Sequence, residues 1–167
     1  IVVDPTPQAP ASPVVREQIV ADFDDPDALA ELAERSDFLT YEIELAGTEA
    51  LETVSRETGT PVHPDPATLS LIEDKLLQKR RLRDADIPVP PFREVNSIAD
   101  LRNTLEELGY PAMLKARKGG YDGRGNVPIH SPDDVTDAFA TIVDAAPNAS
   151  QEDPAGAAMV EAFVNFE

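Results

Sequence analysis

The feature that most constrains this chain is a glycine-rich tract, with four glycines in seven positions at residues 119, 120, 123 and 125. An apolar run at 112–114 precedes the tract and Val127-Pro128-Ile129 follows it, so the stretch predicts two strands joined by a turn. Glycine lets backbone N–H groups approach and surround an anion. Four cationic side chains lie beside the turn: Lys115, Arg117, Lys118 and Arg124. The tract therefore predicts a hairpin that binds a phosphate group.

Two common phosphate-binding motifs are excluded by spacing. A P-loop needs Gly-x-x-x-x-Gly-Lys-Ser/Thr before a helix, and a dinucleotide fingerprint needs Gly-x-Gly-x-x-Gly between a strand and a helix. Neither pattern occurs in the tract. The tract alone also fits a flexible hairpin tip whose charges only contact solvent, so the rest of the chain must decide between the two readings.

Composition limits the classes of partner. The 167 residues include 32 acidic and 14 basic residues, giving a formal charge of −18, which disfavours binding to nucleic acid or to an anionic membrane surface. The acid is spread through the chain, as in proteins of salt-adapted organisms, although a solvated surface explains it equally well. Cysteine is absent and no apolar run reaches the length of a membrane span, so we expect a cytoplasmic protein.

The first part of the chain predicts strands alternating with helices. We expect a buried strand at 1–3, a helix from Asp25-Pro26 to about residue 35, a strand at 38–44, and a helix capped by Thr48 and closed by Gly59. This order is typical of a parallel sheet covered by helices. Glu42 and Glu44 would then end a strand at the sheet edge where ligands bind in such folds.

The second part predicts a small α+β lobe. We expect one long helix at 66–85, a semi-rigid proline-rich hinge at 87–92, and a helix capped by Ser97. The hairpin around the glycine tract, a helix beginning near Ser131 and a strand at 157–164 follow, forming an antiparallel sheet. We therefore expect an α/β domain with a parallel sheet at 1–66 and the lobe within a second domain at 67–167.

Four collinear segments resemble the 5-(carboxyamino)imidazole ribonucleotide synthetase family, ATP-grasp enzymes of purine biosynthesis. Residues 40–44, Thr-Tyr-Glu-Ile-Glu, are similar to the family's Thr-Tyr-Glu-Phe-Glu, and Glu73-Asp74-Lys75 with Lys79 is similar to its Gln-Asp-Arg…Lys helix. Residues 119–125 nearly match its glycine-rich loop, and residues 160–164 resemble its adenine-binding linker. The resemblance implies the end of a Rossmann-like pre-ATP-grasp domain followed by the first lobe of an ATP-grasp domain.

The resemblance also implies an activity and a set of site residues. The family uses ATP to carboxylate 5-aminoimidazole ribonucleotide with bicarbonate through carboxyphosphate. The catalytic candidates are Asp122, Arg124 and Tyr121 in the loop. The nucleotide-binding candidates are Lys75, Lys115, Gly120, Tyr121, Asp122, Gly123, Arg124, Gly125, Asn126, Glu161, Ala162, Phe163 and Val164. Lys75 and Lys115 would contact the phosphates, the loop would cover them, and 161–164 would contact adenine.

Departures and missing parts limit these expectations. Ile43, Glu73, Lys75 and Asn126 replace the phenylalanine, glutamine, arginine and glutamine of the family pattern, and only the lysine changes an expected contact, because it lacks the two-pronged guanidinium. We expect an internal piece of a longer protein, inactive alone, with the ribose-binding glutamate and the Mg²⁺ carboxylates beyond residue 167. The full-length protein is expected to be a homodimer.

Two other functions remain open at this point. The chain could belong to another ATP-grasp ligase, such as a formate-using purine enzyme or a biotin carboxylase. The Tyr121-Asp122 pair favours the 5-(carboxyamino)imidazole ribonucleotide synthetase family over these two. It could instead be a non-catalytic acidic interaction module whose hairpin binds nothing. Nucleotide binding separates this last reading from the enzyme readings.

Overall fold

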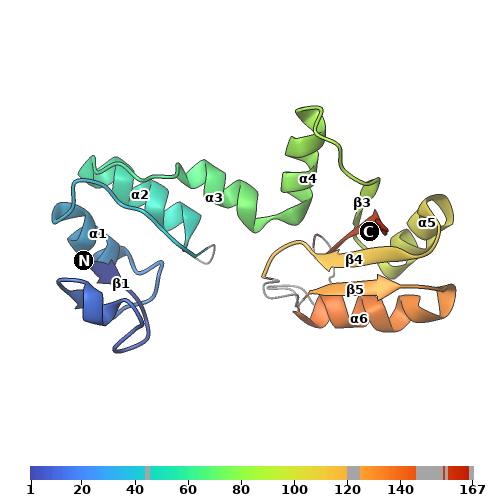
Figure 1. Cartoon of the computed structure of the whole chain (residues 1–167), viewed down its shortest axis with the longest axis horizontal. Helices are drawn as coiled ribbons and strands as arrows, with labels where there is room; N and C mark the ends of the chain where they lie inside the picture. The colour runs from blue at the N-terminus through green and yellow to red at the C-terminus, as the bar shows by residue number, and fades with distance from the viewer. Residues whose placement is uncertain (44–45, 120–124, 146–155, 157, 166–167) are drawn as a thin grey trace. The chain divides into compact units, whose positions relative to one another are not determined.

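The computed structural model describes residues 1–43, 46–119, 125–145, 156 and 158–165 (Figure 1). Its backbone contacts divide the chain into two compact units, Ile1–Ile72 and Glu73–Glu167, each with its own apolar core. Within the described residues, no helix is long and apolar enough to cross a membrane. Mixed α/β structure was expected, and both units have it.

Unit 1, residues 1–72, contains a small parallel sheet and two well-defined helices. Strand β1 (Val2–Val3) pairs in parallel with β2 (Gln18–Ile19), and a short 3-10 turn, η1 (Ser12–Val14), lies between them. Helix α1 (Pro26–Glu34) begins where the Asp25 carboxylate accepts a hydrogen bond from the Ala28 N–H, which confirms the predicted start. Helix α2 (Thr48–Thr58) ends at Gly59, with φ of 78°.

Two expectations for unit 1 are wrong in detail. The described part of the predicted strand at 38–44 forms one isolated parallel bridge, between Leu39 and Val62; Glu44 lies outside the described residues. Prolines 61 and 64 flank Val62 and have no N–H to donate, so the ladder does not continue. Thr48 is the first helical residue and the cap is Gly47, where a Cβ atom would lie 2.7 Å from the Asp24 Cβ. Close backbone packing therefore sets this helix start.

The predicted strand at residues 1–3 is also less buried than expected. Val2 and Val3 are half-buried, and 36% of Ile1 is exposed. The core of unit 1 instead lies between α1, α2 and the bridge at Leu39, with Leu29, Leu51 and Val54 among its buried members. Helix packing, more than the two-residue strands, buries the apolar surface of this unit.

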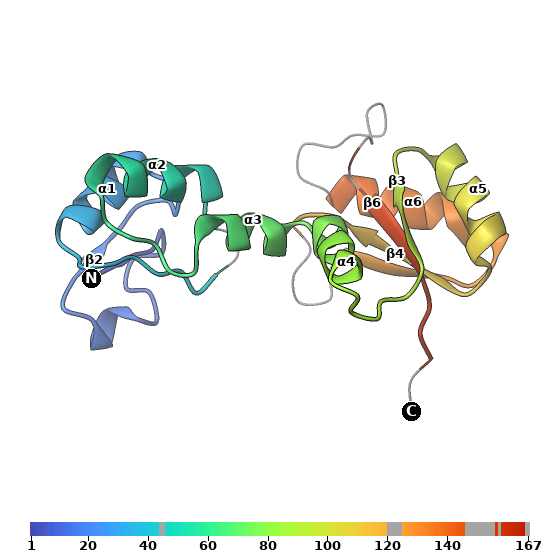
Figure 2. The same ribbon diagram turned by 90° about the horizontal axis from the view of Figure 1, so that it is seen from above.

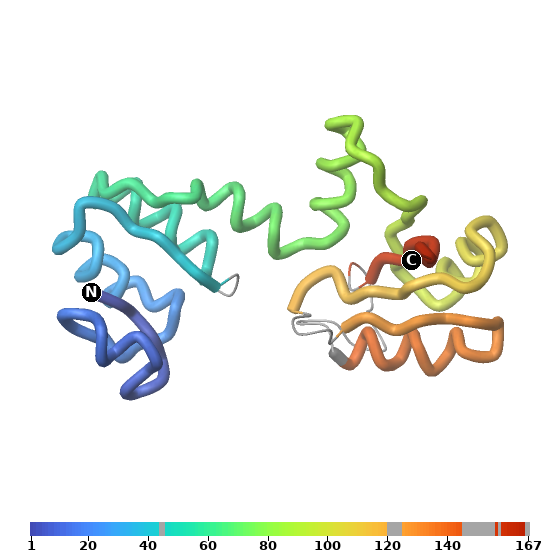
Figure 3. Tube along the Cα trace, in the orientation of Figure 1, coloured from blue at the N-terminus to red at the C-terminus, as the bar shows by residue number. Residues whose placement is uncertain are grey.

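Unit 2, residues 73–167, is built on an antiparallel sheet, as predicted, but the sheet has four strands where the sequence predicts three. The strands are β3 (Phe92–Val95), β4 (Ala112–Ala116), β5 (Asn126–Ile129) and β6 (Ala158–Ala162), in the spatial order β3-β6-β4-β5. The trace in Figure 3 shows the β4 and β5 hairpin running beside the last helix. Strand β3 was not predicted, because its four residues follow a proline-rich segment and show no clear alternation.

Two helices cover one face of this sheet (Figure 2). Helix α5 (Ile98–Leu108) begins at Ser97, whose hydroxyl accepts from the Asp100 N–H, and ends at Gly109 as predicted. A 3-10 turn, η2 (Pro132–Asp134), leads into α6 (Val135–Ala145). Alternate residues of β4 and β6, including Leu114 and Val160, point into the core that these helices close. The other face of the sheet is left for different contacts.

The predicted long helix at 66–85 is two helices. Helix α3 (Pro66–Glu73) ends before Asp74, and α4 (Lys75–Asp84) begins after it. Asp74 adopts extended angles, φ −109° and ψ 105°, and its carboxylate accepts hydrogen bonds from the Leu76 and Leu77 N–H groups. An aspartate with these bonds favours a helix start over a helix interior. The break gives the chain a second helix N-terminus, adjacent to Lys75.

Candidate functional site

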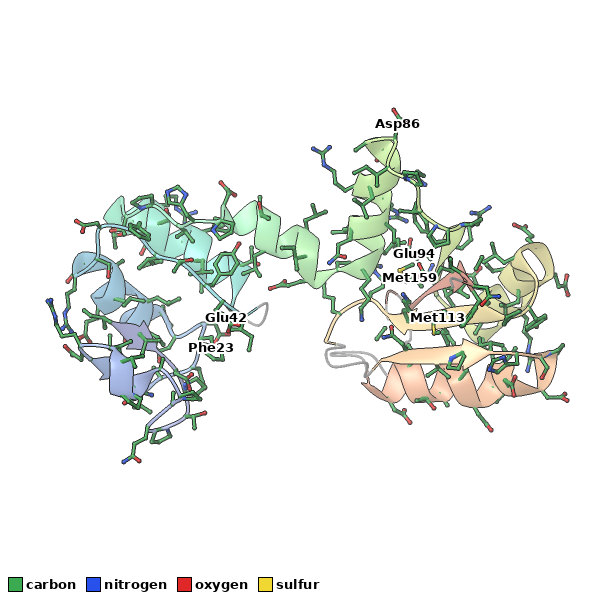
Figure 4. All side chains as sticks on the ribbon, viewed as in Figure 1. Phe23, Glu42, Asp86, Glu94, Met113 and Met159 are labelled. Carbon is green, nitrogen blue, oxygen red and sulfur yellow. The ribbon has the colours of Figure 1, made fainter. Side chains whose placement is uncertain are left out.

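The uncovered face of the unit 2 sheet carries the charged residues that the sequence singled out. Because side chains alternate along a strand, Lys115 of β4 and Glu161 of β6 point away from the face that α5 and α6 cover. Glu94 of β3 lies on the same face as Phe92, which packs with Leu76 of α4 and with Met159. Figure 4 labels Glu94, Met113 and Met159 on this part of unit 2. Helix α4 therefore lies across the face that holds Lys115.

Glu161 lies at the centre of this face between two lysines. Its side chain is only 9% exposed; Lys115 Nζ lies 2.5 Å from Oε1 and Lys79 Nζ lies 2.7 Å from Oε2. Oε2 has no well-aligned hydrogen bond among the described residues, so the Lys79 contact acts mainly through charge. Burial alone would raise the pKa of Glu161, but the two lysines outweigh it and the pKa is lowered. Glu161 is therefore a carboxylate that fixes both lysines.

Lys75 is a second cation held at this end of β4. Its backbone N–H donates to the Arg117 carbonyl at 2.9 Å and its Nζ donates to the Ala116 carbonyl at 3.3 Å. Burial, and then repulsion from Lys115, lowers the pKa of Lys75. An anion placed between the two lysines would offset their mutual repulsion. The pair of Lys75 and Lys115 is thus suited to bind an anion such as a phosphate.

Arg117 belongs to a neighbouring network and not to the free cations expected beside the glycine tract. Its Nε and Nη2 donate to the two oxygens of Asp74 at 3.1 and 2.5 Å, and its Nη1 donates to Glu94 Oε1 at 2.7 Å. Arg80 of α4 binds the other oxygen of Glu94 at 2.9 Å. The expectation that Arg117 faces a phosphate is therefore wrong, because its guanidinium is bonded to two carboxylates.

The network also changes the ionisation of its members. Burial would raise the pKa of Asp74, but hydrogen bonds and charge from Arg117, with the two α4 N–H groups, lower it. The hydrogen bonds that Arg117 donates to Asp74 raise the pKa of Arg117. Asp74 has a side chain only 2% exposed, so its charge depends on these partners. The pair remains ionised around neutral pH.

The structure describes only some of the remaining predicted site residues. Gly120, Tyr121, Asp122, Gly123 and Arg124 lie outside the described residues. Gly125 accepts a hydrogen bond from the Ala116 N–H at 2.8 Å, and Asn126 pairs with Lys115 in the hairpin register. Ala162 ends β6, and Phe163 and Val164 beyond it are 43% and 49% exposed. Lys115 and Lys75 therefore lie at the end of β4, Glu161 lies on the same face of the sheet, and the linker begins at the other end of β4, where the Phe163 N–H donates to the Pro111 carbonyl.

Several residues that build this site have no role predicted from the sequence. Asp74 was placed inside a helix, Glu94 lay in a strand that was not predicted, and Lys79 was noted only as part of a helix pattern. Lys79 stands four positions after Lys75, on the same side of α4, which is a signal that sequence contains. Within the described residues no group of three or more acidic or histidine side chains could hold a metal ion.

Family comparisons match both units. Residues 80–167 match the ATP-grasp domain, and residues 1–73 match the ribonucleotide synthetase preATP-grasp domain. The N5-carboxyaminoimidazole ribonucleotide synthase of Brucella melitensis is 39% identical over 169 aligned positions, which cover 100% of this chain and 43% of that protein. The chain thus spans less than half of this relative.

Solved structures give the same likeness. The chain is similar to N5-carboxyaminoimidazole synthetase from Staphylococcus aureus complexed with ADP, with a TM-score of 0.87 and 30% identity, covering 99% of this chain and 41% of that one. It is also similar to the synthase from Aspergillus clavatus in complex with ADP and 5-aminoimidazole ribonucleotide, with a TM-score of 0.79 and 29% identity over 99% of this chain and 40% of that one. Both likenesses extend over the two units.

Proposed function

The chain belongs to the ATP-grasp family, and from this premise we propose that it forms part of a ligase that carboxylates 5-aminoimidazole ribonucleotide with bicarbonate in purine biosynthesis. ATP supplies the phosphoryl group that activates bicarbonate as carboxyphosphate, and ADP and phosphate are the other products. The observation that carries the proposal is the pair Lys75 and Lys115, held at one end of the sheet beside Glu161. Solved structures that match 99% of this chain contain ADP, and binding of its phosphates by this lysine pair agrees with that.

The residues of this chain receive the following roles. Lys75 and Lys115 bind and orient the phosphates, and Glu161 keeps Lys115 directed across the sheet until phosphate oxygens share it. The residues from Glu161 to Val164 contact adenine through backbone groups and apolar side chains, which suits the exposure of Phe163 and Val164. The tract from Gly120 to Asn126 covers the phosphates. Asp122, with Arg124 and Tyr121, acts on the amine and on the bicarbonate-derived group.

The other parts of the proposal concern the whole protein. We assign residues 1–66 to the pre-ATP-grasp domain and 67–167 to the ATP-grasp domain, with a hinge near 87–92. Magnesium is expected to be held by carboxylates outside this chain, so no step is assigned to it here. A cytoplasmic homodimer is the expected assembly of the full-length protein.

Replacement of Lys115 tests the proposal in the full-length protein. A charged hydrogen bond to phosphate contributes roughly 1.5–3 kcal/mol, so Lys115→Ala should weaken ATP binding about tenfold or more. Arg102→Ala, which removes an exposed arginine that bonds Thr136, is the matched control and should leave binding unchanged. Isothermal titration with ATP measures both.

Because Lys115 also pairs with buried Glu161, its loss leaves that carboxylate with Lys79 alone. The double variant Lys115→Ala with Glu161→Gln removes this imbalance and separates a folding defect from a binding defect. A folded double variant with wild-type ATP affinity would refute the phosphate role of Lys115. Absence of nucleotide binding in the wild type would favour the acidic interaction module, and bicarbonate-dependent turnover of a different amine would favour another ATP-grasp ligase.

A further inference from the structure

Arg117 joins three elements of unit 2 at the point where β4 ends. Its guanidinium binds Asp74, which lies just before α4, and Glu94, which lies on β3. Its backbone carbonyl accepts the Lys75 N–H at 2.9 Å. One residue thus connects the end of β4 to α4 by side chain and by backbone, and connects it to β3 by side chain.

The guanidinium is committed to these contacts. Nε, Nη1 and Nη2 each donate to a carboxylate, in a fork that only arginine offers, and the side chain is 16% exposed. Asp74 Oδ1 receives Arg117 Nε and also the Leu76 N–H of α4. The Asp74 carboxylate that binds Arg117 therefore also fixes the first turn of α4, which carries Lys75.

We propose that Arg117 is a positioning residue that holds Lys75 next to Lys115 so that the two lysines bind the nucleotide phosphates together. Arg117 acts through Asp74 and through its own carbonyl, and it does not contact phosphate. This inference rests on the proposed function for the identity of the anion, whereas the connection of Arg117 to Lys75 is a property of the fold alone.

The arrangement explains why two lysines remain close despite their repulsion. Lys75 Nζ is held by the Ala116 carbonyl, one residue before Arg117, and its backbone is held by Arg117 itself. Without the fork, Asp74 loses the charged partner that joins it to the end of β4, so the first turn of α4 holds Lys75 less firmly beside Lys115. The cost of losing Arg117 should then appear only with ligands that carry phosphates.

A double-mutant cycle in the full-length protein tests the inference. Arg117→Met, Lys75→Met and the double variant are compared with wild type for binding of ADP and of adenosine. Arg117→Met should weaken ADP binding about tenfold in the wild-type background. It should weaken ADP binding less than about threefold when Lys75 is already methionine, because the effects of substituting residues that act through one another are not additive. Adenosine binding should change less than about twofold in every variant. Arg102→Met, with an exposed arginine, is the control.

A readout without nucleotide keeps the inference separate from the proposed function. Hydrogen exchange at the Lys75 amide, which donates to the Arg117 carbonyl, should be faster in Arg117→Met and close to wild type in Arg102→Met. Arg117→Lys, which keeps the charge and one bond, should recover part of the ADP affinity and serves if Arg117→Met fails to fold.

The outcomes are distinct. Equal loss of ADP affinity with and without Lys75 would mean that Arg117 contacts phosphate directly, and unchanged affinity in a folded Arg117→Met would mean that Lys75 needs no such support; either result overturns the inference. A wild-type protein that binds no ADP overturns the proposed function and the phosphate part of the inference together, while faster exchange at Lys75 would still show the connection in the fold.

Discussion

The two units of this chain have the same kinds of elements, and both are acidic, but they differ in how many basic residues accompany the acidic ones. Unit 1, residues 1–72, has 3 of the 14 basic residues and 15 of the 32 acidic ones, whereas unit 2 has the other 11 and 17. Among the described residues, the ion pairs of unit 1 join Arg35 to Glu17 and to Glu31, all of them on exposed side chains. Those of unit 2 include the half-buried and buried pairs of Asp74, Glu94 and Glu161.

This difference shows what the charges can do in each unit. Exposed ion pairs contribute little to stability, about 0–1 kcal/mol each, so the acidic residues of unit 1 mainly keep its surface hydrated. Buried pairs are costly unless every partner is present, so those of unit 2 specify where each lysine lies. A chain that is acidic overall can thus offer a local cationic site, provided that the cations are concentrated and held by buried carboxylates.

Substitution of Asp122, in the glycine tract of unit 2, is expected to have the largest effect on activity and so to test most sharply whether the chemistry belongs to this unit. A carboxylate that orients an attacking amine and accepts its proton contributes about 10²–10⁴ in rate. Asp122→Asn keeps a turn-forming side chain but removes the base, so carboxylation in the full-length protein should fall by about this factor while ATP affinity stays within a few fold. Steady-state assays of ADP release with 5-aminoimidazole ribonucleotide measure it.

A matched acidic residue provides the control for that experiment. Asp133→Asn changes an exposed aspartate at the start of η2 and should leave turnover near that of wild type. If Asp122→Asn also keeps near-normal turnover, Asp122 only stabilises the turn, and the tract has no role beyond covering phosphates. The catalytic part of the proposed function would then need another base.

Sequence predicted the parts of the fold that local signals specify. Caps at Asp25 and Ser97, the glycine at 109 and the hairpin around residues 112–129 follow from short patterns, and each is present. The break at Asp74 is not predicted because the apolar spacing continues across it, and Arg117, which pairs with the Asp74 carboxylate, is 43 residues away. Long-range ion pairs leave no local signal, so a candidate phosphate ligand could not be distinguished from a buried support.

Within the site, sequence singled out Lys115, Lys75 and Glu161 as nucleotide contacts but could not show how they are held. The alternation of β4 and β6 places Lys115 and Glu161 on one face, which a correct strand pairing would have revealed. Strand β3, which pairs with the other edge of β6 and adds Glu94 to this face, lies too close to prolines to be predicted. Tertiary pairing therefore decided the details of the site that residue type alone left open.

Acid should destabilise unit 2 more than unit 1. Asp74 and Glu161 have folded-state pKa values below their ordinary 3.8 and 4.5, so their contribution to stability is present above the ordinary values and is lost as pH falls through the lowered ones. Amide protection of β4 and β6 should therefore decrease as the pH falls below these ordinary values, while protection of α1 and α2 changes less. Hydrogen exchange resolves the two units.

Variants that lack one carboxylate test whether these groups cause the acid sensitivity of unit 2. Glu161→Gln should weaken unit 2 at neutral pH and flatten its response to acid, because one group that loses its charge has gone. An exposed counterpart in unit 1, Glu31→Gln, should alter neither property measurably. Equal acid sensitivity of the two units would contradict the distinction between buried and exposed pairs.

Salt should produce the smallest effect, and it should act mostly on unit 1. Its 15 acidic residues far outnumber its 3 basic ones, so self-repulsion opposes folding at low ionic strength, and molar salt shortens the screening length to about 3 Å. Relief of about 1 kcal/mol corresponds to a rise in melting temperature of about 2–4 °C for a chain of this size. Potassium chloride from dilute buffer to molar concentration should give that rise, with protection of α1 and α2 increasing more than that of β4 and β6. Potassium glutamate at equal ionic strength separates screening from ion-specific effects. A melting temperature that stays constant or falls would contradict both the expectation of salt adaptation and the assignment of uncompensated repulsion to unit 1.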